Sequence, residues 1–179
     1  MTQVGTVYGQ ALYDLAKAEQ LDRLILQELT ALDESFSAEP DYLKLLCAPQ
    51  LNKQERCRIV DESFGGKVHP YVLNFLNILT EKGYTRHFHS CFETFEALYN
   101  QDNGIMTVTA TTAVPLSQVQ DERLRQKLSA ITGKTIRLKN RIDPSLLGGV
   151  QLDMGNIRME DTVAQRLENL RKLLQQTTL

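Results

Sequence analysis

The sequence predicts an α+β fold, in which a six-helix antiparallel bundle over residues 1–104 is followed by a small β-α-β-β-α domain over residues 105–179. Apolar residues recur at helical spacing as far as Tyr99, and a β-branched run begins at Ile105. All 6 Phe and 6 Tyr lie at or before Tyr99. The first segment has 9 Lys and Arg against 15 Asp and Glu, whereas the second has 11 against 7, so the net charge changes sign near Gly104.

Six helices are predicted in the first segment from apolar positions that follow the i, i+3, i+4, i+7 rule. They are expected over residues 4–16, 21–36, 42–46, 53–63, 70–82 and 88–99. Asn52 can cap the fourth helix, and Gly65 can end it. Pro70 suits the first turn of the fifth helix, where a missing backbone N–H costs nothing. Short connections between six such helices favour an antiparallel bundle.

The second segment is predicted to form a small sheet with two helices packed against it. Strands are expected over residues 105–113, 135–139 and 149–154, because β-branched and alternating apolar residues gather there. Ser117 can cap a helix that Gly133 ends. A final helix is predicted from one apolar stripe, which consists of Val163, Leu167, Leu170 and Leu174.

No residue pattern indicates catalysis or cofactor binding. The run from Thr132 to Thr135 looks like the end of a phosphate-binding loop, but Leu128 stands where the first glycine is needed. The run also follows a helix and precedes a strand, which is the reverse of the order that directs a helix N-terminus at a phosphate. Adjacent carboxylates such as Asp61 and Glu62 diverge on a helix. We therefore expect no enzyme activity and no cofactor.

Three side chains that can bind zinc lie close together in the sequence, namely His87, His89 and Cys91. On a helix, His87 and Cys91 share a face, whereas His89 points about 200° away from His87 at 100° per residue. The three groups cannot converge on one ion. We therefore expect no metal site.

The apolar stretches fall far short of the roughly 18 to 20 residues needed to cross a bilayer, and the N-terminal residues contain neither a secretory signal nor a transit peptide. Cys47, Cys57 and Cys91 are an odd number without CxxC spacing, which favours reduced thiols. These features together predict a cytoplasmic protein.

The basic second segment raises nucleic acid as an alternative partner. Its candidate phosphate-binding residues are Arg123, Arg125, Lys127, Lys134, Arg137, Lys139 and Arg141. The segment has no Phe, Tyr or Trp, and single-strand recognition relies on such stacking platforms. The absence of aromatic residues thus argues against a cytoplasmic nucleic-acid-binding or regulatory adaptor, which is kept as the alternative function.

The first and fifth predicted helices have wider apolar arcs than a surface helix needs. Val7 to Ala16 covers roughly 180° and the arc between Ile78 and Leu73 about 220°, whereas an ordinary surface helix needs about 100°. Such helices are either central in the bundle or form a groove that accepts a partner's helix. The pattern alone leaves both possibilities open.

Three motifs occur in order along the chain, namely Tyr8-x-x-Ala11-Leu12-x-x-Leu15-Ala16, Asn74-Phe75-Leu76-x-x-Leu79-x-Glu81-Lys82-Gly83 and Ile142-Asp143-Pro144-Ser145-Leu146-Leu147-Gly148-Gly149-Val150. Together they resemble the delta subunit of bacterial F-type ATP synthases, a family that includes the mitochondrial oligomycin-sensitivity-conferring protein. The resemblance covers essentially the whole chain, and its third motif is the most distinctive.

The resemblance implies a non-enzymatic stator subunit at the cytoplasmic face of the cell membrane, where it couples rotor torque to ATP synthesis and ion transport. The helical domain would bind the N-terminal helix of an alpha subunit, and the second domain the membrane-anchored b subunits. The residues expected to contact the alpha-subunit helix are Tyr8, Ala11, Leu12, Leu15, Phe75, Ile78 and Leu79, although some can be core residues. Asp143, Pro144, Gly148 and Gly149 form the signature turn, and we expect them to shape the backbone.

The chain departs from the family pattern at a few positions. Tyr84 stands where Arg is usual, and Glu160 and Asp161 lie in a segment that replaces the usual Ile-Asp-Gly-Ser-Val. Ala164 stands where a basic residue is common. These changes affect the turn expected before the last helix.

Overall fold

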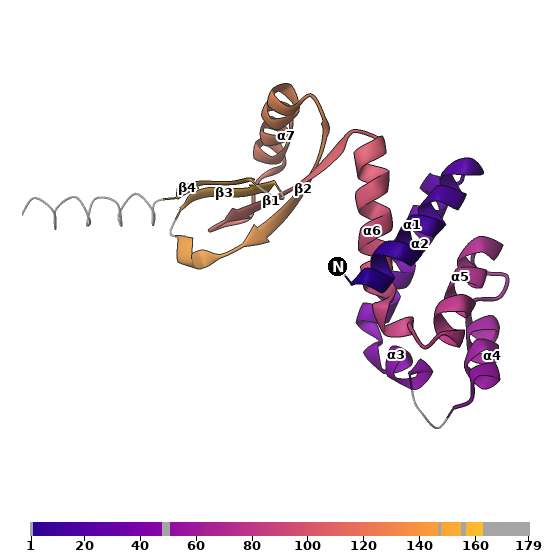
Figure 1. Ribbon diagram of the computed structural model, residues 1–179. Coiled ribbons are helices and arrows are strands. Elements are labelled where there is room, and N and C mark those ends of the chain that lie inside the picture. The colour runs from indigo at the N-terminus through magenta and orange to yellow at the C-terminus, as the bar shows by residue number, and fades with distance from the viewer. Residues whose placement is uncertain (1, 48–50, 147, 155–156, 163–179) are drawn as a thin grey trace, which may run out of the picture. The chain divides into compact units, whose positions relative to one another are not determined.

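The computed structural model describes residues 2–47, 51–146, 148–154 and 157–162 of the 179-residue chain. The chain divides into two compact units, Met1–Asn100 and Gln101–Leu179 (Figure 1). Each unit has its own hydrophobic core, and the two are described separately.

The first unit is helical, and its described residues contain the six α-helices that the sequence predicts. They are α1 (Gln3–Ala18), α2 (Asp22–Ala38), α3 (Pro40–Leu46), α4 (Lys53–Phe64), α5 (Pro70–Glu81) and α6 (Phe88–Asp102), with a short 3-10 helix (Thr85–His87) before α6. Asn52 caps α4 by accepting a hydrogen bond from the backbone N–H of Glu55, whose carboxylate in turn accepts one from the N–H of Asn52. Pro70 occupies the first turn of α5, as predicted.

Aromatic side chains fill much of the first unit's core, which explains why all twelve lie before residue 100. Phe36 of α2 packs edge to face against Phe88 of α6, with ring centroids 4.9 Å apart. Tyr13 of α1 packs in the same way against Phe95 of α6, at 5.3 Å. These contacts tie three helices to one core.

The second unit is a four-stranded mixed sheet with a helix on one face (Figure 1). Its elements are β1 (Ile105–Thr112), α7 (Gln118–Thr132), β2 (Thr135–Ile142), a 3-10 turn (Pro144–Leu146), β3 (Gly149–Met154) and β4 (Ile157–Thr162). The strand order is β2-β1-β3-β4. β1 and β2 are parallel and joined through α7, as a crossover requires, while the other two pairings are antiparallel.

The last part of the second unit differs from the sequence prediction. A fourth strand, Ile157–Thr162, pairs antiparallel with β3 where a turn was expected, so that prediction was wrong. Ile157 and Met159 alternate with charged residues, and only two residues separate them from β3, which is a hairpin signal. The predicted final helix with Val163, Leu167, Leu170 and Leu174 lies outside the described residues.

Strand alternation gives the sheet one apolar face. Val108, Ala110, Ile136 and Leu152 are buried there together with Leu128 of α7. The opposite face contains the row Arg137, Lys139 and Arg141 on β2, which is an edge strand. The crossover helix therefore covers the apolar side of the sheet.

Candidate functional site

The apolar arc of α1 is divided between core and surface. Leu12, Tyr13 and Ala16 are buried in the first unit. Val7, Ala11 and Leu15, at i, i+4 and i+8, are exposed. At 100° per residue these three span about 80° of the helix, directly beside the buried half. An exposed apolar stripe on a helix whose other face is already packed is available to a partner.

Tyr8 lies at the border between the buried and exposed halves of α1. Its ring packs edge to face on Tyr84, just after α5, with centroids 5.9 Å apart and planes at 61°. The pair joins the edge of the α1 stripe to the chain segment that follows α5.

The wide apolar arc of α5 is mostly core. Phe75 and Leu79 are buried with the other large side chains of the first unit. Ile78, at the edge of the arc, is 36% exposed. The long arc of α5 thus reflects its central position in the helical unit, with one apolar residue left at the surface.

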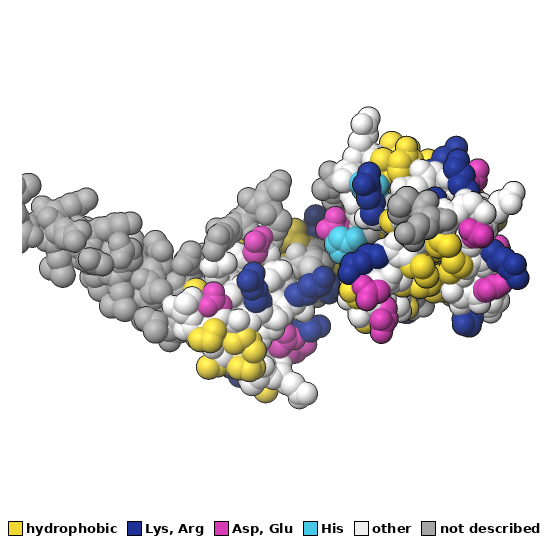
Figure 2. Space-filling model, turned by 90° about the horizontal axis from the view of Figure 1, so that it is seen from below, with side chains coloured by type: hydrophobic (Ala, Val, Ile, Leu, Met, Phe, Trp, Pro, Cys, Tyr) yellow, Lys and Arg dark blue, Asp and Glu magenta, His cyan; other side chains and the backbone are white. Residues whose placement is uncertain are grey.

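The predicted partner-binding residues therefore fall into two groups. Ala11, Leu15 and Ile78 are exposed and Tyr8 is partly so, whereas Leu12, Phe75 and Leu79 are core residues. Val7 is exposed on the same stripe, where its helical phase places it, although it is not among the residues that the sequence predicts for the site. Figure 2 shows that hydrophobic side chains reach the surface of both units in patches among charged ones.

A close crossing of α1 and α6 holds this stripe in place. A methyl group added at Gly5 would lie 2.4 Å from the Ser90 Oγ, and one at Gly9 would lie 2.5 Å from the carbonyl oxygen of Cys91. Only glycine allows the two backbones to approach this closely. The sequence prediction does not include this contact, although the Gly-x-x-x-Gly spacing of Gly5 and Gly9, on the face opposite the exposed stripe, is a signal for it.

Replacing Gly9 with Leu is expected to destabilise the protein by about 2 kcal/mol or more, because the backbone of α6 cannot move aside as a flexible side chain could. Replacing the exposed neighbour Gln10 with Leu should change the free energy of unfolding by no more than about 0.5 kcal/mol. Urea unfolding of both variants measures the difference. Equal free energies of unfolding for the two variants would show that α1 and α6 cross less closely than the structure indicates.

An ionic link joins α2 and α6. The Nδ1 of His89 lies 2.8 Å from the Oδ1 of Asp33, and its Nε2 lies 3.5 Å from the Oε1 of Glu93. The hydrogen bond to Asp33 raises the pKa of His89 above its ordinary value of 6.5, against an opposing effect of burial, and the two negative charges raise it further. The charged form of His89 is therefore favoured in the folded state.

A raised folded-state pKa means that the His89 link contributes its full stability below the ordinary pKa of histidine and loses it as the pH rises through the raised value. Because the side chain is 65% exposed, the contribution should stay within about 1 kcal/mol. Asp33→Asn is expected to lower the His89 pKa toward 6.5, and Glu93→Gln to lower it less. NMR titration of the imidazole measures both shifts. A larger shift in the Glu93 variant would contradict this order.

The residues that looked like chemical sites in the sequence have structural roles. Gly133 ends α7 in a left-handed conformation with φ 68° and leads into β2, as expected for a turn. Burial raises the pKa of the Cys91 thiol to about 11, so this cysteine stays protonated at neutral pH. Among the described ranges, no group of three or more His, Cys, Asp and Glu side chains is arranged to hold a metal ion.

The signature turn after β2 is built by local hydrogen bonds. The Oδ1 of Asp143 accepts bonds from the Oγ of Ser145 at 2.6 Å and from its backbone N–H at 3.0 Å. Those bonds hold the pKa of Asp143 below its usual value. The Asp143 N–H donates to the Thr112 carbonyl, which fastens the turn to β1, and Pro144 begins the short 3-10 segment.

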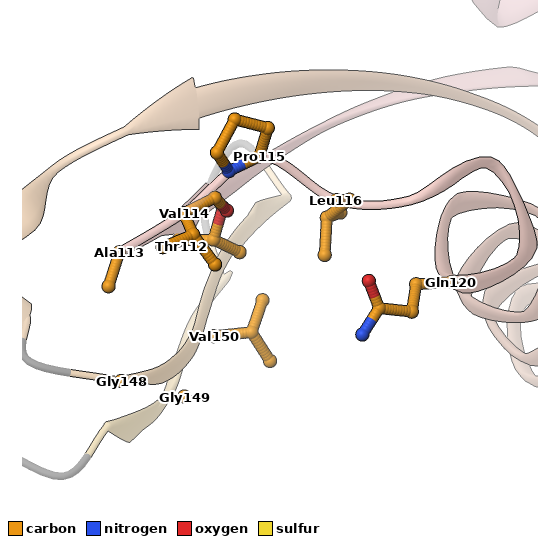
Figure 3. Close-up of a pocket in the computed structure, with 9 residues that line it drawn as sticks. All are labelled: Thr112, Ala113, Val114, Pro115, Leu116, Gln120, Gly148, Gly149 and Val150. Atoms are coloured by element: carbon orange, nitrogen blue, oxygen red, sulfur yellow. The ribbon is translucent and has the colours of Figure 1, made fainter.

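Gly148 and Gly149 line a hollow of about 360 Å³ between the start of β3 and the loop after β1 (Figure 3). Gly149 has φ 88°, a conformation that side chains rarely adopt. In Figure 3, the side chains of Val150, Leu116 and Gln120 surround the space next to the glycine backbone. The two glycines keep this side of the hollow free of side chains.

Within the part of the chain that the structure describes, no helix has the length and apolarity to span a membrane.

Comparison with known proteins places these features in context. The model of the ATP synthase delta (OSCP) subunit family matches residues 4–174. The chain is 32% identical to ATP synthase subunit delta of Desulfitobacterium hafniense (strain DSM 10664 / DCB-2) over 93% of each chain. It is 31% identical to ATP synthase subunit delta of Syntrophomonas wolfei subsp. wolfei, with 96% of this chain and 94% of the relative covered.

A solved structure shares the fold. One chain in the cryo-EM structure of the Toxoplasma gondii mitochondrial ATP synthase hexamer matches with a TM-score of 0.78 and 18% identity, over 97% of this chain and 98% of that one.

This chain belongs to the ATP synthase delta (OSCP) subunit family. It is a peripheral stalk component of an F-type ATP synthase and has a structural rather than a catalytic role. The predicted family is thereby confirmed.

Proposed function

We propose that this subunit joins the catalytic head of the synthase to its membrane-anchored arms, at the cytoplasmic face of the cell membrane. Residues 1–104 would bind the N-terminal helix of an alpha subunit, and residues 105–179 the b subunits. The observation that carries the proposal is the exposed apolar stripe Val7, Ala11 and Leu15 on a helix whose opposite face is packed in a core.

The shape of this stripe suits an amphipathic helix. Such a helix places its apolar residues on a partner at i, i+3, i+4 and i+7 spacing, and the α1 stripe offers matching positions four residues apart. We assign direct contacts to Tyr8, Ala11, Leu15 and Ile78. Leu12, Phe75 and Leu79 lie beneath them in the core and would fix the positions of α1 and α5.

The b-subunit attachment is assigned to the second unit through the family resemblance. There, Asp143 and Pro144 shape the end of β2 and fasten it to β1, and Gly148 and Gly149 open the hollow before β3. We propose that these residues maintain the shape of a docking surface rather than supply binding energy themselves.

Such a subunit acts through the strength of its two interfaces. Rotor torque tends to turn the catalytic head, and a chain attached to both the head and the arms resists that rotation as long as neither attachment breaks. No proton or group transfer is required. The interface with the head therefore needs well-packed apolar contacts, because the loss of one such contact strongly weakens binding.

Titration calorimetry tests this function directly. The full chain is titrated with a synthetic peptide that comprises the N-terminal residues of the alpha subunit of the same synthase. Saturable binding with a negative heat-capacity change is expected, because apolar surface is buried. A parallel fluorescence titration with single-stranded and duplex DNA should show no salt-sensitive binding. If the peptide does not bind and DNA does, the result would favour the nucleic-acid adaptor instead.

A further inference from the structure

The sheet of the second unit has a polar face on the side away from α7. Even-numbered residues such as Val108, Ile136 and Leu152 pack toward Leu128 of α7, so the odd-numbered residues of β1, β2 and β3 point to the opposite side. α7, the only α-helix that lies wholly within the described part of this unit, is on the other side of the sheet (Figure 1). We call the polar side the basic sheet face. Its central residues are Thr107, Thr109 and Thr111 on β1 and the exposed Arg137, Lys139 and Arg141 on β2.

Each of these threonines is paired with one cation in the parallel register of β1 and β2. The pairs are Thr107 with Arg137, Thr109 with Lys139, and Thr111 with Arg141. Residues two apart on a strand lie about 6.8 Å apart, so the cationic row is about 14 Å long. The short threonine side chains are partly or fully buried, whereas the cations are exposed at the sheet edge. The face is therefore a shallow trough along β1 with a positive wall on β2.

Two members of the cationic row lack an acidic partner on the chain. On α7, Arg125 is paired with Asp121, whose carboxylate lies 2.7 Å away. Lys139 and Arg141, by contrast, form no salt bridge with any residue that the structure describes. The carboxylate of Asp143 accepts its hydrogen bonds within the signature turn. Exposed cations without a counter-charge are complementary to a negatively charged partner.

The signature turn keeps the end of this row in place. The N–H of Asp143 donates to the carbonyl oxygen of Thr112 at 2.9 Å, which continues the pairing of β2 with β1 beyond Arg141. Arg141 is thereby held in line with Lys139 within the paired part of the strand. The motif that resembles the family most distinctively thus also supports the basic sheet face.

We propose that the basic sheet face binds an acidic helix of the b subunits. The proposal rests on the proposed function, which assigns the b subunits to residues 105–179. Carboxylates at positions i, i+4 and i+8 of a helix are about 6 Å apart and about 12 Å from first to last. These spacings are close to those of the cationic row, about 6.8 Å and about 14 Å. A helix along β1 would place such carboxylates over Lys139 and its neighbours, and the threonine hydroxyls can donate to its polar side chains.

Two other occupants fit the face less well. A second copy of the chain that paired through β2 would bring its own cations beside these, and like charges so placed repel. A nucleic acid would place phosphates near Asp153 of β3, which is exposed and pairs with Thr109 on the other side of the trough. Residues 105–179 also contain no Phe, Tyr or Trp on which bases could stack. A helix can instead direct its acidic side chains toward β2 alone.

Charge reversal in the full chain tests the proposal, with the soluble part of the b subunits as the titrant. Lys139→Glu should weaken binding about tenfold or more, because it replaces an attraction with a repulsion, and Lys139→Arg should bind like the unmodified chain. Arg123→Glu is the matched control, because it makes the same change of charge at an exposed position of α7, on the other side of the sheet. The deficit of Lys139→Glu should shrink as salt is raised, since salt screens the repulsion.

The possible results separate the basic sheet face from the b-subunit assignment. If the b subunits do not bind the unmodified chain, the assignment is wrong and the proposal is overturned with it. If they bind, and Lys139→Glu and Arg123→Glu have equal affinities, only the basic sheet face is overturned. A parallel titration with DNA addresses the other partner. DNA binding that Lys139→Glu abolishes, while the b subunits retain their affinity, would mean that a nucleic acid occupies the face and would contradict the proposal.

A photo-crosslinking residue at position 139 identifies the occupant directly. We expect crosslinks to a b-subunit peptide that has Asp or Glu residues four positions apart, and none from the same probe at position 123. Crosslinks between two copies of this chain would contradict the proposal. Absence of crosslinks from position 139 in a complex that has formed would equally contradict it.

Discussion

Replacing Leu15 with Asp is expected to weaken binding of the alpha-subunit helix about 30-fold or more. Leu15 lies on the exposed stripe of α1, and a charged side chain there would have to be desolvated against an apolar partner. Loss of a central apolar anchor costs about 2 kcal/mol or more, which corresponds to that change in Kd. Calorimetry with the alpha-subunit peptide measures the effect.

Leu24→Asp is the matched control for this experiment. Leu24 is a leucine of the same exposed fraction, 41%, but it lies on α2 outside the proposed site. Both variants should fold normally because neither side chain is buried. Equal losses of affinity would remove the α1 stripe from the site. Ile78→Asp should weaken binding as well, and an unchanged affinity would remove Ile78 alone.

A chain that ends at residue 103 is expected to separate hydrolysis from pumping. It retains α1 to α6 with their aromatic core and loses the entire sheet. In reconstituted membranes, ATP hydrolysis by the catalytic head should persist, because no catalytic group is removed. ATP-driven ion pumping should fall to near background, because the head is no longer attached to the arms.

Two controls support this second experiment. Binding of the alpha-subunit peptide to the fragment should match that of the full chain, which shows that the first unit is folded. Adding an excess of full chain should restore pumping. Full pumping with the fragment alone would show that residues 104–179 are not the link to the stator arms.

The helices of both units could be predicted because their apolar spacing is periodic and several of their ends have a local signal. Asn52, Pro70 and Gly133 act where their caps and backbone preferences placed them. β4 was missed because Glu160 and Asp161 in a six-residue segment hide the alternation of Ile157 and Met159. Pairing with β3 supplies the stability that local propensity does not indicate.

The candidate site was harder to predict, because an apolar arc does not reveal which part faces the core. Leu12 and Leu15 are equivalent in the sequence pattern, yet one is buried and the other exposed. The difference arises from the α1–α6 crossing at Gly5 and Gly9, which sets the rotation of α1. This contact joins residues more than 80 positions apart, and its one sign in the sequence, the Gly-x-x-x-Gly spacing in α1, does not identify the helix that packs there.

A subunit that links the catalytic head to the stator arms must hold both partners at once, and this can be measured with one chain. The alpha-subunit peptide is attached to a biosensor surface, the full chain is bound to it, and the soluble part of the b subunits is then added. We expect a second binding signal with the full chain and none with residues 1–103. A signal from the b subunits on the fragment, or none on the full chain, would contradict the division of the two attachments between the two units.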